Sequence, residues 1–501
     1  MDLSALELIT YISLGTLVYY FLIELAKPKE GAQKWVAFFF VFIIALCLIY
    51  VAYMYFKKEE KKEGKTEAKE EEEILEEETK SESEEAPTEF VQGDYISNKK
   101  EFVMLNQATI GKNSIEYEDF KRWYLSPEFL EKYTEAIGEG LRIKRKRLLE
   151  VKKQYAADLK ALKGVEKPKD TITSLLNSVR DKNDDLKMLE SGLCNVNDLL
   201  SEIRKRENSL SVNTTRKGLI LALTDKKNGI DTLIGRNNIK DQLVGKLFAF
   251  SQNPKIFMSS FQNMAIYGPS GVGKSKLARV IANVYSKCGI LLRDHVHIIT
   301  KQALTTAYVN ESGRMTRKVL MMNLEGVTFL DEAYDITPEP SMFGGNRDHG
   351  SEAITEIVSF TDVYKGLSIL IVAGYEDQME TRFMASNEGL PRRFPNKIIL
   401  QPYNAKELTD ILVKFLLDIC PDLKFNEKQG NYIYTVINYL NKENPDVFKT
   451  QAGAMENLAS SISTCIYSSP DKVWSRDYES IILNGFNSYL VQHNVSLDCL
   501  E

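Results

Sequence analysis

The sequence has few cysteine and histidine residues and no excess of basic charge. Its six cysteines are scattered without a CxxC pair, which argues against a disulfide framework and favours reduced thiols in a cytosol-like compartment. His295 and His297 would share one face of a strand, but no nearby cysteine completes a metal-ligand set, so we interpret the pair as incidental. The net charge of −6 gives no reason to expect nucleic-acid binding, because a phosphate-tracking domain shows a clustered basic face.

Two long apolar segments are present near the start of the chain. Residues 8–26 are apolar except for Glu24 near the end, and residues 35–56 contain no charge. A helix of about 20 apolar residues spans the hydrocarbon core of a bilayer, so both segments are predicted to be transmembrane helices. The short polar stretch between them predicts a membrane hairpin over residues 1–56. The alternative for the first segment, a cleaved secretory signal, lacks a basic start and a small-residue cleavage site.

A charged tether is predicted over residues 57–95, because this segment has little to bury and many like charges. Residues 96–216 are predicted to be helical, with apolar residues at heptad spacing that indicate a coiled coil. Gly164 and Pro168 separate two heptad runs, which predicts an antiparallel helical hairpin. A continuous oligomer-forming stalk is the alternative. The basic stretch 142–147 is interpreted as a solvated face rather than a contact with lipid or nucleic acid. The heptad residues are Leu141, Leu148, Val151, Tyr155, Leu162, Ile172, Leu175, Val179, Leu186, Leu189, Leu193, Val196, Leu200, Ile203 and Leu210.

The stretch AIYGPSGVGKSKLARV (265–280) contains the pattern G-x-x-x-x-G-K-[ST] between an apolar strand and a helical run. Its glycines let backbone N–H groups converge on phosphates, and the following helix presents its positive end to them. We therefore predict an ATP site in which Lys274 contacts the β and γ phosphates and the hydroxyl of Ser275 holds Mg²⁺. The predicted phosphate loop consists of Gly268, Pro269, Ser270, Gly271, Val272, Gly273, Lys274 and Ser275.

A second apolar strand over residues 327–330 ends in two carboxylates, Asp331 and Glu332. Asp331 is predicted to orient the magnesium shell and Glu332 to polarise the attacking water, which is an arrangement for hydrolysis. The alternative is that the two acids cap the next helix. Because ATP and reduced thiols are found on the cytoplasmic side, we expect an integral membrane protein whose ATP site faces the cytoplasm.

Residues 217–501 resemble AAA+ ATPases, specifically the CbbX type, which includes the red-lineage Rubisco activases and relatives among sporulation and secretion ATPases. The similar blocks are LIGRNNIKDQL (233–243), FLDEAYDI (329–336), GSEAITEIVSF (350–360), SILIVAGYEDQM (368–379) and NEGLPRRFPNKIILQPYNAKEL (387–408). The resemblance implies an α/β P-loop core with a parallel sheet between helices over residues 217–402 and a helical lid over residues 403–501. It also implies ATP and Mg²⁺ as cofactors and a homo-oligomeric ring, a hexamer by family likeness.

The same resemblance implies roles for individual residues. Ile234 and Gly235 would lie against the adenine. Arg393, which precedes Phe394 as in the family's S-R-F pattern, would act as a finger on the γ-phosphate of the neighbouring subunit, with Arg392 as the second candidate. A finger supplied in trans makes activity depend on a ring. Tyr308 would belong to the aromatic pore loop that grips a polypeptide.

Two departures from the family pattern bear on turnover. The strand SILIVA leads into Gly374 and Tyr375 rather than the usual sensor asparagine, which leaves Glu376, Asp377 or a residue outside this stretch as the polar candidate. The lid has Gly-Ala-Met-Glu-Asn at 453–457, where the family often places an arginine. The sequence therefore predicts a membrane-anchored ring ATPase that remodels a protein, with an ATP-dependent scaffold of slow turnover as the alternative. A DNA-directed ATPase would require a basic groove that this region lacks.

Overall fold

The computed structural model describes residues 115–164, 172–305, 311–337, 349–468 and 474–495. The predicted membrane segments 8–26 and 35–56, the tether over 57–95 and the predicted pore residue Tyr308 lie outside the described residues. Within the described stretches, no helix combines the length and the apolar character that a membrane crossing needs. Membrane anchoring and the pore loop therefore stay predictions.

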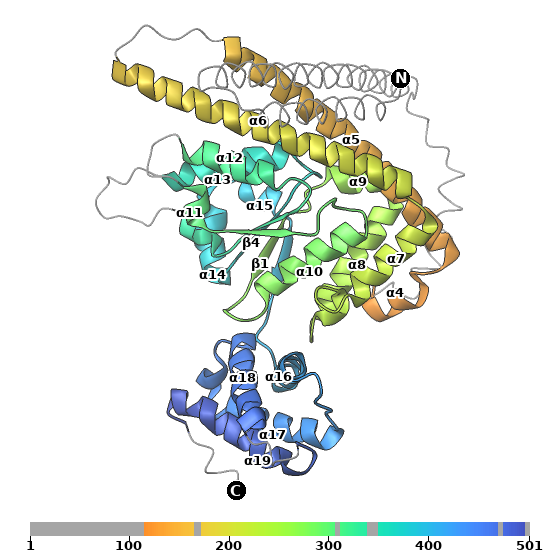
Figure 1. The fold of residues 1–501 in the computed structure, drawn as a ribbon, viewed down its shortest axis with the longest axis vertical. Helices are drawn as coiled ribbons and strands as arrows, with labels where there is room; N and C mark the ends of the chain where they lie inside the picture. Colours follow the sequence, from red (N-terminus) through yellow and green to blue (C-terminus); the bar gives the residue numbers. More distant parts are fainter. Residues whose placement is uncertain (1–114, 165–171, 306–310, 338–348, 469–473, 496–501) are drawn as a thin grey trace, which may run out of the picture. The chain divides into compact units, whose positions relative to one another are not determined.

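The predicted parallel sheet is confirmed. Its described strands lie in the order β2-β3-β4-β1-β5, and each neighbouring pair is parallel (Figure 1). The three inner strands are buried along their whole length, as their nearly continuous apolar sequences predict for a sheet covered on both faces. The carboxyl ends of parallel strands share one edge, so the segments after β1, β3 and β4 emerge together. The strands are β1 (Met264–Tyr267), β2 (Val296–Ile299), β3 (Val327–Leu330), β4 (Ile369–Gly374) and β5 (Asn396–Ile399).

Helices surround this sheet. Helix α10 begins directly after the phosphate loop and packs against β2, β3 and α7, while α12 and α13 pack on each other. The core helices are α7 (Val212–Thr224), α8 (Asn237–Gln252), α9 (Pro254–Ser259), α10 (Lys274–Lys287), α11 (Lys301–Leu304), α12 (Ser312–Met322), α13 (His349–Val363), α14 (Glu376–Gln378) and α15 (Leu390–Arg393). Shorter helical turns are η1 (Ile230–Thr232), η2 (Ala333–Ile336), η3 (Met379–Phe383) and η4 (Met384–Ser386).

The range predicted for the lid folds into helices with their own apolar core. Helices α16 and α17 begin at capping boxes, in which the Asn404 and Asn426 side chains accept from the backbone N–H three residues on. Buried side chains from all four long helices meet between them, among them Leu412, Ile437 and Phe486. The elements are α16 (Ala405–Ile419), α17 (Glu427–Glu443), η5 (Pro445–Phe448), α18 (Ala452–Ser468), α19 (Trp474–Leu490) and η6 (Val491–His493).

The predicted antiparallel helical hairpin is present, but it is part of the ATPase core and not a separate coiled coil. Helix α4 (Tyr117–Trp123) precedes α5 (Pro127–Gly164) and α6 (Ile172–Ser209), and the two long helices run in opposite directions (Figure 1). They pack on each other, but α5 also packs on α7, α8 and α9, and α6 packs on α12. Their apolar stripes therefore face the core as well as each other. Helix α7 crosses the predicted domain boundary at residues 216 and 217, so the hairpin and the core are not separated there.

The basic stretch 142–147 is mostly not a solvated face, which corrects the sequence interpretation. Lys144 forms an ion pair with Glu325 in which the lysine side chain is 1% exposed and the glutamate side chain 0% exposed. Arg147 donates to the carbonyl oxygens of Met258 (3.0 Å) and Lys365. Only a tertiary partner such as Glu325, far along the chain, could make burial of this lysine tolerable. Lys144 and Arg147 of α5 therefore attach the hairpin to the core.

Candidate nucleotide-binding site

The phosphate loop lies between β1 and α10 in a conformation that depends on glycine. Gly268, Gly271 and Gly273 have φ angles of 156°, 74° and 94°, a region that other residues rarely adopt. A Cβ built on Gly271 would lie 1.8 Å from the carbonyl oxygen of Thr450. The N-cap of α10 is Gly273, which has no side chain to satisfy the first N–H groups of the helix. The start of α10 therefore leaves backbone donors for an anion.

Lys274 is the first residue of α10 and is 8% exposed. Its Nζ atom donates to the carbonyl oxygens of Gly268 (2.9 Å) and Pro269 (3.1 Å), so the side chain folds back over the loop. The same Nζ atom lies 5.4 Å from the centre of the Tyr375 ring, at the end of β4. The ammonium group is therefore held at the sheet edge where the chain segments that follow β1 and β4 leave the sheet.

The two carboxylates follow β3 as predicted. Asp331 and Glu332 are half-buried, and the backbone N–H of Glu332 donates to Oδ1 of Asp331 (3.2 Å). Glu332 is the N-cap of η2 but makes no side-chain cap hydrogen bond, which disfavours the alternative that the acids merely cap the next helix. Its φ of 47° places a non-glycine residue in the left-handed region, and such strain is often found at functional positions.

A hydroxyl from Ser275, a carboxylate from Asp331 and phosphate oxygens form the hard oxygen donor set that Mg²⁺ prefers. Ser275 is the second residue of α10 and Asp331 follows the buried strand β3, so both stand at the carboxyl edge of the sheet. Within the described residues, no group of three or more His, Cys, Asp and Glu side chains could hold a metal by itself.

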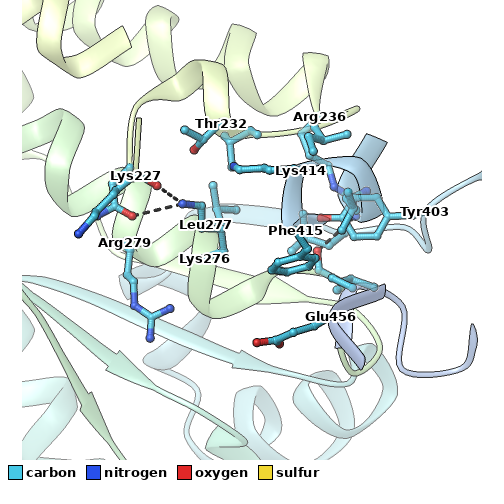
Figure 2. A pocket seen from close by; sticks show the side chains of 18 of the residues that line it. Lys227, Thr232, Arg236, Lys276, Leu277, Arg279, Tyr403, Lys414, Phe415 and Glu456 are labelled. Atoms are coloured by element: carbon cyan, nitrogen blue, oxygen red, sulfur yellow. Dashed lines mark hydrogen bonds between the residues drawn. The ribbon is translucent and has the colours of Figure 1, made fainter. Parts of the chain in front are cut away.

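A cavity of about 840 Å³ opens beside the loop, between α10 and the lid. Figure 2 shows Lys414 and Phe415 of α16 and Glu456 of α18 on one side, with Lys276 and Leu277 of α10 on the other. Ile234, Val272 and Gly273 also line the cavity, so the structure brings these predicted residues together with the lid. Eight of the 21 lining residues are charged, and apolar side chains make up much of the remaining wall, so the cavity offers an apolar surface for a base beside charged groups.

The charges of this cavity affect one lysine in particular. Burial, together with the nearby positive charges of Lys414 and Arg279, lowers the pKa of Lys276 to about 8. Its Nζ atom donates to the carbonyl oxygen of Lys227 and to Oδ1 of Asn228 (3.3 Å; Figure 2). This residue follows Ser275 directly, yet the motif alone gives no signal for its environment.

Arg236 and Tyr403 connect the loop to the lid, and sequence reasoning missed both. The guanidinium carbon of Arg236 lies 4.0 Å from the centre of the Tyr403 ring. Arg236 donates to the carbonyl oxygens of Val272 (3.3 Å) and Gln401 (2.8 Å) and is only 7% exposed. The sequence signal that could have pointed to Arg236 is its position directly after Gly235, a glycine whose φ of 65° turns the chain. The partner Tyr403 is too distant in sequence for any local pattern to predict.

The two candidate finger residues differ in environment. The guanidinium of Arg393 forms an ion pair with Asp362 of α13, and its Nη1 atom donates to Gly389 O (3.1 Å). Its side chain is 12% exposed, whereas Arg392 is an exposed residue. Neither arginine lines the cavity described above. The structure therefore places both outside the cavity of their own subunit.

Comparisons with known proteins agree with this geometry. The family model described as "ATPase family associated with various cellular activities (AAA)" matches residues 264–398, from β1 to β5. A "Protein CfxQ homolog" from Galdieria sulphuraria is 32% identical over 227 residues, which are 45% of this chain and 69% of that protein. The chain belongs to the CfxQ (CbbX-type) family of AAA+ ATPases.

Two further relatives of this AAA+ chain have different printed functions. The chloroplastic ribulose bisphosphate carboxylase/oxygenase activase of Cyanidioschyzon merolae is 32% identical over 168 residues, 34% of this chain and 54% of that protein. The ESX-3 secretion system protein EccA3 of Mycolicibacterium smegmatis is 32% identical over 152 residues, 30% of this chain and 24% of that protein. The chain thus matches only about half, or less, of the length of these two relatives.

Membership in the family gives this AAA+ chain its activity and cofactors. It is an ATPase that binds ATP with Mg²⁺. The metal, when bound, neutralises charge on the phosphates and orients them. In the chain itself, the unpaired N–H groups at the start of α10 and Lys274 would bind the phosphates. Ser275 and Asp331 would bind the metal, and Glu332 follows Asp331 directly. The roles of these individual residues are predictions that follow from their positions.

Proposed function

We propose that this AAA+ ATPase is anchored in a membrane, assembles as a hexameric ring, and uses ATP hydrolysis to remodel or thread a protein near that membrane. The observation that carries the proposal is the position of Arg393. It is held by Asp362 and Gly389 and does not line its own nucleotide cavity. A finger in this place acts on the nucleotide of a neighbouring copy, so hydrolysis takes place at a seam between subunits.

The chain's own groups divide the work of hydrolysis. Lys274 and the first N–H groups of α10 hold the phosphates, and Glu332 accepts a proton from the attacking water. Ile234 and Gly235 lie against the base, beside the lid. Arg393, or Arg392 if the exposed arginine takes this role, stabilises the charge that spreads over the transferred phosphoryl group. These roles require an ordered seam between two copies.

The apolar segments 8–26 and 35–56 support the membrane anchor by their length and lack of charge. ATP is available in the cytoplasm, which supports a cytoplasmic location for the ATPase domain. The acidic net charge and the contacts of Lys144 and Arg147 with the core support a protein substrate rather than a nucleic acid.

One observation favours the alternative, an ATP-dependent membrane scaffold with slow or partner-stimulated turnover. Glu456 lines the nucleotide cavity in the segment where related lids often carry an arginine. A carboxylate there cannot stabilise the γ-phosphate and repels it at short range. In this alternative, ATP binding assembles the ring, and little phosphate is released.

Mixing two inactive variants of the full chain tests hydrolysis at the seam. Glu332→Gln keeps its finger but lacks the base, and Arg393→Ala keeps the base but lacks the finger. Each variant alone should lose roughly a thousandfold in phosphate release. In a randomly mixed ring, about a quarter of the seams combine an intact base with an intact neighbouring finger, so activity returns to that fraction. Measurement uses purified protein in detergent micelles or nanodiscs.

Three outcomes separate the possibilities. If mixing restores nothing, hydrolysis does not use a finger in trans. If Arg392→Ala rather than Arg393→Ala gives the inactive partner that complements, the exposed arginine is the finger and the seam stands. If the unmodified chain assembles with ATP but releases no phosphate, with or without candidate protein partners, the scaffold alternative replaces the motor.

A further inference from the structure

The candidate finger Arg393 lies at the edge of the sheet where the strands begin. It is the last residue of α15, and β5 starts three residues later. The buried side chain of Asn263, directly before β1, holds this part of the backbone. Its Nδ2 atom donates to the carbonyl oxygen of Arg393 (3.1 Å), and its Oδ1 atom accepts the backbone N–H of Leu370 in β4 (2.9 Å). The backbone of the finger is therefore bound to the beginnings of β1 and β4.

A tight turn over residues 364–367 connects α13 to β4 at the same edge. The turn is closed by the backbone N–H of Leu367, which donates to the carbonyl oxygen of Tyr364 (3.0 Å). It begins two residues after Asp362, which is in the last turn of α13 and forms the ion pair with the guanidinium of Arg393. A displacement of this turn would therefore move the carboxylate that holds the finger.

Arg147 of the hairpin holds this turn. Its Nη1 atom donates to the carbonyl oxygen of Lys365 in the turn and to that of Met258 in α9 (3.0 Å). A Cβ built on Gly366 would lie 2.7 Å from the same Nη1 atom and 2.3 Å from the Met258 oxygen. The φ of Gly366 is 78°, so this position favours glycine for its backbone as well as for the close approach. One guanidinium group therefore links α5 to the segments that lead into β4 and β1.

A cavity of about 700 Å³ lies between α5 and the end of α13. Its lining residues include Arg147, Asp362, Lys365, Tyr155 and Leu189. The space beside Asp362 is therefore not filled by side chains of the hairpin. The turn has room to shift once the hydrogen bonds from Arg147 are lost.

We propose that Arg147 is a positioning residue for the arginine finger. It holds the turn 364–367, and the turn sets the place of Asp362 and of the guanidinium paired with it. The hairpin thereby controls the finger that its own subunit offers to a neighbour. This inference rests on the role of Arg393 proposed above and adds the part of the chain that regulates it. Arg147 should matter in the subunit that supplies the finger and not in the subunit that hydrolyses the nucleotide.

Mixed rings of the full chain measure these two roles separately. Arg147→Met keeps the apolar stem of the side chain and removes its donors. Combined with Glu332→Gln, it gives a subunit that can only supply a finger, and this subunit is mixed with Arg393→Ala. Combined with Arg393→Ala, it gives a subunit that can only hydrolyse, and this subunit is mixed with Glu332→Gln.

The reference is the mixture of Glu332→Gln with Arg393→Ala. We expect phosphate release by the first Arg147→Met mixture to fall roughly tenfold to a hundredfold below this reference, the effect of a group that is displaced by about 1 Å. The second mixture should stay within twofold of the reference. A merely structural role would lower both mixtures equally, because a less stable subunit supplies a finger and hydrolyses nucleotide less well.

Arg206→Met in α6 is the matched control. Arg206 also attaches the hairpin to the core through carbonyl oxygens, those of Leu291 (3.0 Å) and Leu292. That segment leads into β2, which lies at the opposite end of the strand order from β5. The loss of Arg206 should therefore leave the two mixtures equal to each other.

An Asp362→Ala background tests the route from Arg147 to the finger. In this background, Arg147→Met should cause no further loss in the subunit that supplies the finger, because the carboxylate through which it acts is absent. An undiminished further loss would show that Arg147 acts by another route and would overturn the inference.

Equal phosphate release by the two Arg147→Met mixtures would also overturn the inference, whether both are lowered or both match the reference. If Arg147→Met prevents assembly, Arg147→Lys, which keeps the charge, replaces it in the same mixtures, and equal release again overturns the inference. A ring in which Arg392 is the finger would overturn it while the seam stands. If Glu332→Gln and Arg393→Ala fail to complement each other in the reference mixture, the proposed hydrolysis at the seam is refuted first, so the two failures are distinguishable.

Discussion

Replacing Lys144 by methionine should detach the helical hairpin from the ATPase core. The Nζ atom of Lys144 is the ionic partner of Glu325, and both side chains are at most 1% exposed. The Oε2 atom of Glu325 also accepts the backbone N–H of Leu292 (3.1 Å), while Oε1 is buried without a partner among the described residues. Removing one member of a buried pair leaves an uncompensated charge and costs about 3 to 5 kcal/mol. We expect the free energy of unfolding to fall by that amount.

The measurement uses urea unfolding of the full chain, followed by tryptophan fluorescence. Trp123 is a suitable reporter because its ring lies 5.1 Å from that of Phe129 in α5 and 5.9 Å from that of Phe248 in α8. The matched control is Arg142→Met in the same helix. Arg142 pairs with Glu139 (3.4 Å), but the two side chains are 67% and 42% exposed, so its loss should cost less than about 1 kcal/mol.

A second variant tests whether the charge itself is responsible. Lys144→Met combined with Glu325→Gln removes both charges and keeps most of the buried volume, so much of the lost stability should return. If Lys144→Met costs no more than Arg142→Met, the buried pair does not hold the hairpin. If the double variant is no better than the single one, lost packing rather than an unpaired carboxylate is the cause.

Two further predictions concern the nucleotide cavity. Gly271→Ala should weaken binding of a fluorescent ATP analogue tenfold or more, because the new Cβ would lie 1.8 Å from Thr450 O and would force the lid away from the phosphate loop. The control is Gly245→Ala, because nothing lies within 4 Å of a Cβ at that position. Equal affinities in the two variants would contradict the reasoning. Lys276 has a pKa of about 8 in the folded protein against 10.5 as its ordinary value, so between these pH values the unfolded chain holds a proton that the folded chain has released. Stability from this group should therefore rise as pH rises through that window, and the melting temperature of Lys276→Met, measured across it, should lack the rise that the unmodified protein shows.

Local patterns predicted the parts of the site that depend on neighbouring residues in the sequence. The phosphate loop, the strand before it and the helix after it are one continuous segment, and glycine at 268, 271 and 273 meets a backbone need that only this residue type satisfies. Asp331 and Glu332 follow a buried strand, so their place at the sheet edge also follows from the sequence. The structure describes each of these elements where the pattern predicted it.

The remaining features depend on contacts that no local pattern contains. Heptad spacing on α5 predicts an apolar stripe but does not say whether a partner helix or a domain core covers it, and here both do. The cationic run 142–147 is predicted to be solvent-exposed, because the sequence does not show that Glu325 pairs with Lys144. Arg236 and Tyr403 meet only because the lid folds back on the core. Burial of charge and closure of a cavity are tertiary properties, which explains why these interpretations were wrong or missing.

The ion pair between Arg393 and Asp362 is compatible with a finger that acts on a neighbour. The Asp362 side chain is 38% exposed, and a pair with one member in contact with water is worth about 1 kcal/mol or less. A finger that accelerates hydrolysis a thousandfold contributes about 4 kcal/mol to the transition state. In the proposed seam, exchange of the carboxylate for the phosphoryl group of a neighbouring subunit would therefore be favourable by roughly 3 kcal/mol in the transition state. In the proposed ring, the same pair would order the guanidinium before two subunits meet, so that forming the seam would not require ordering a free arginine.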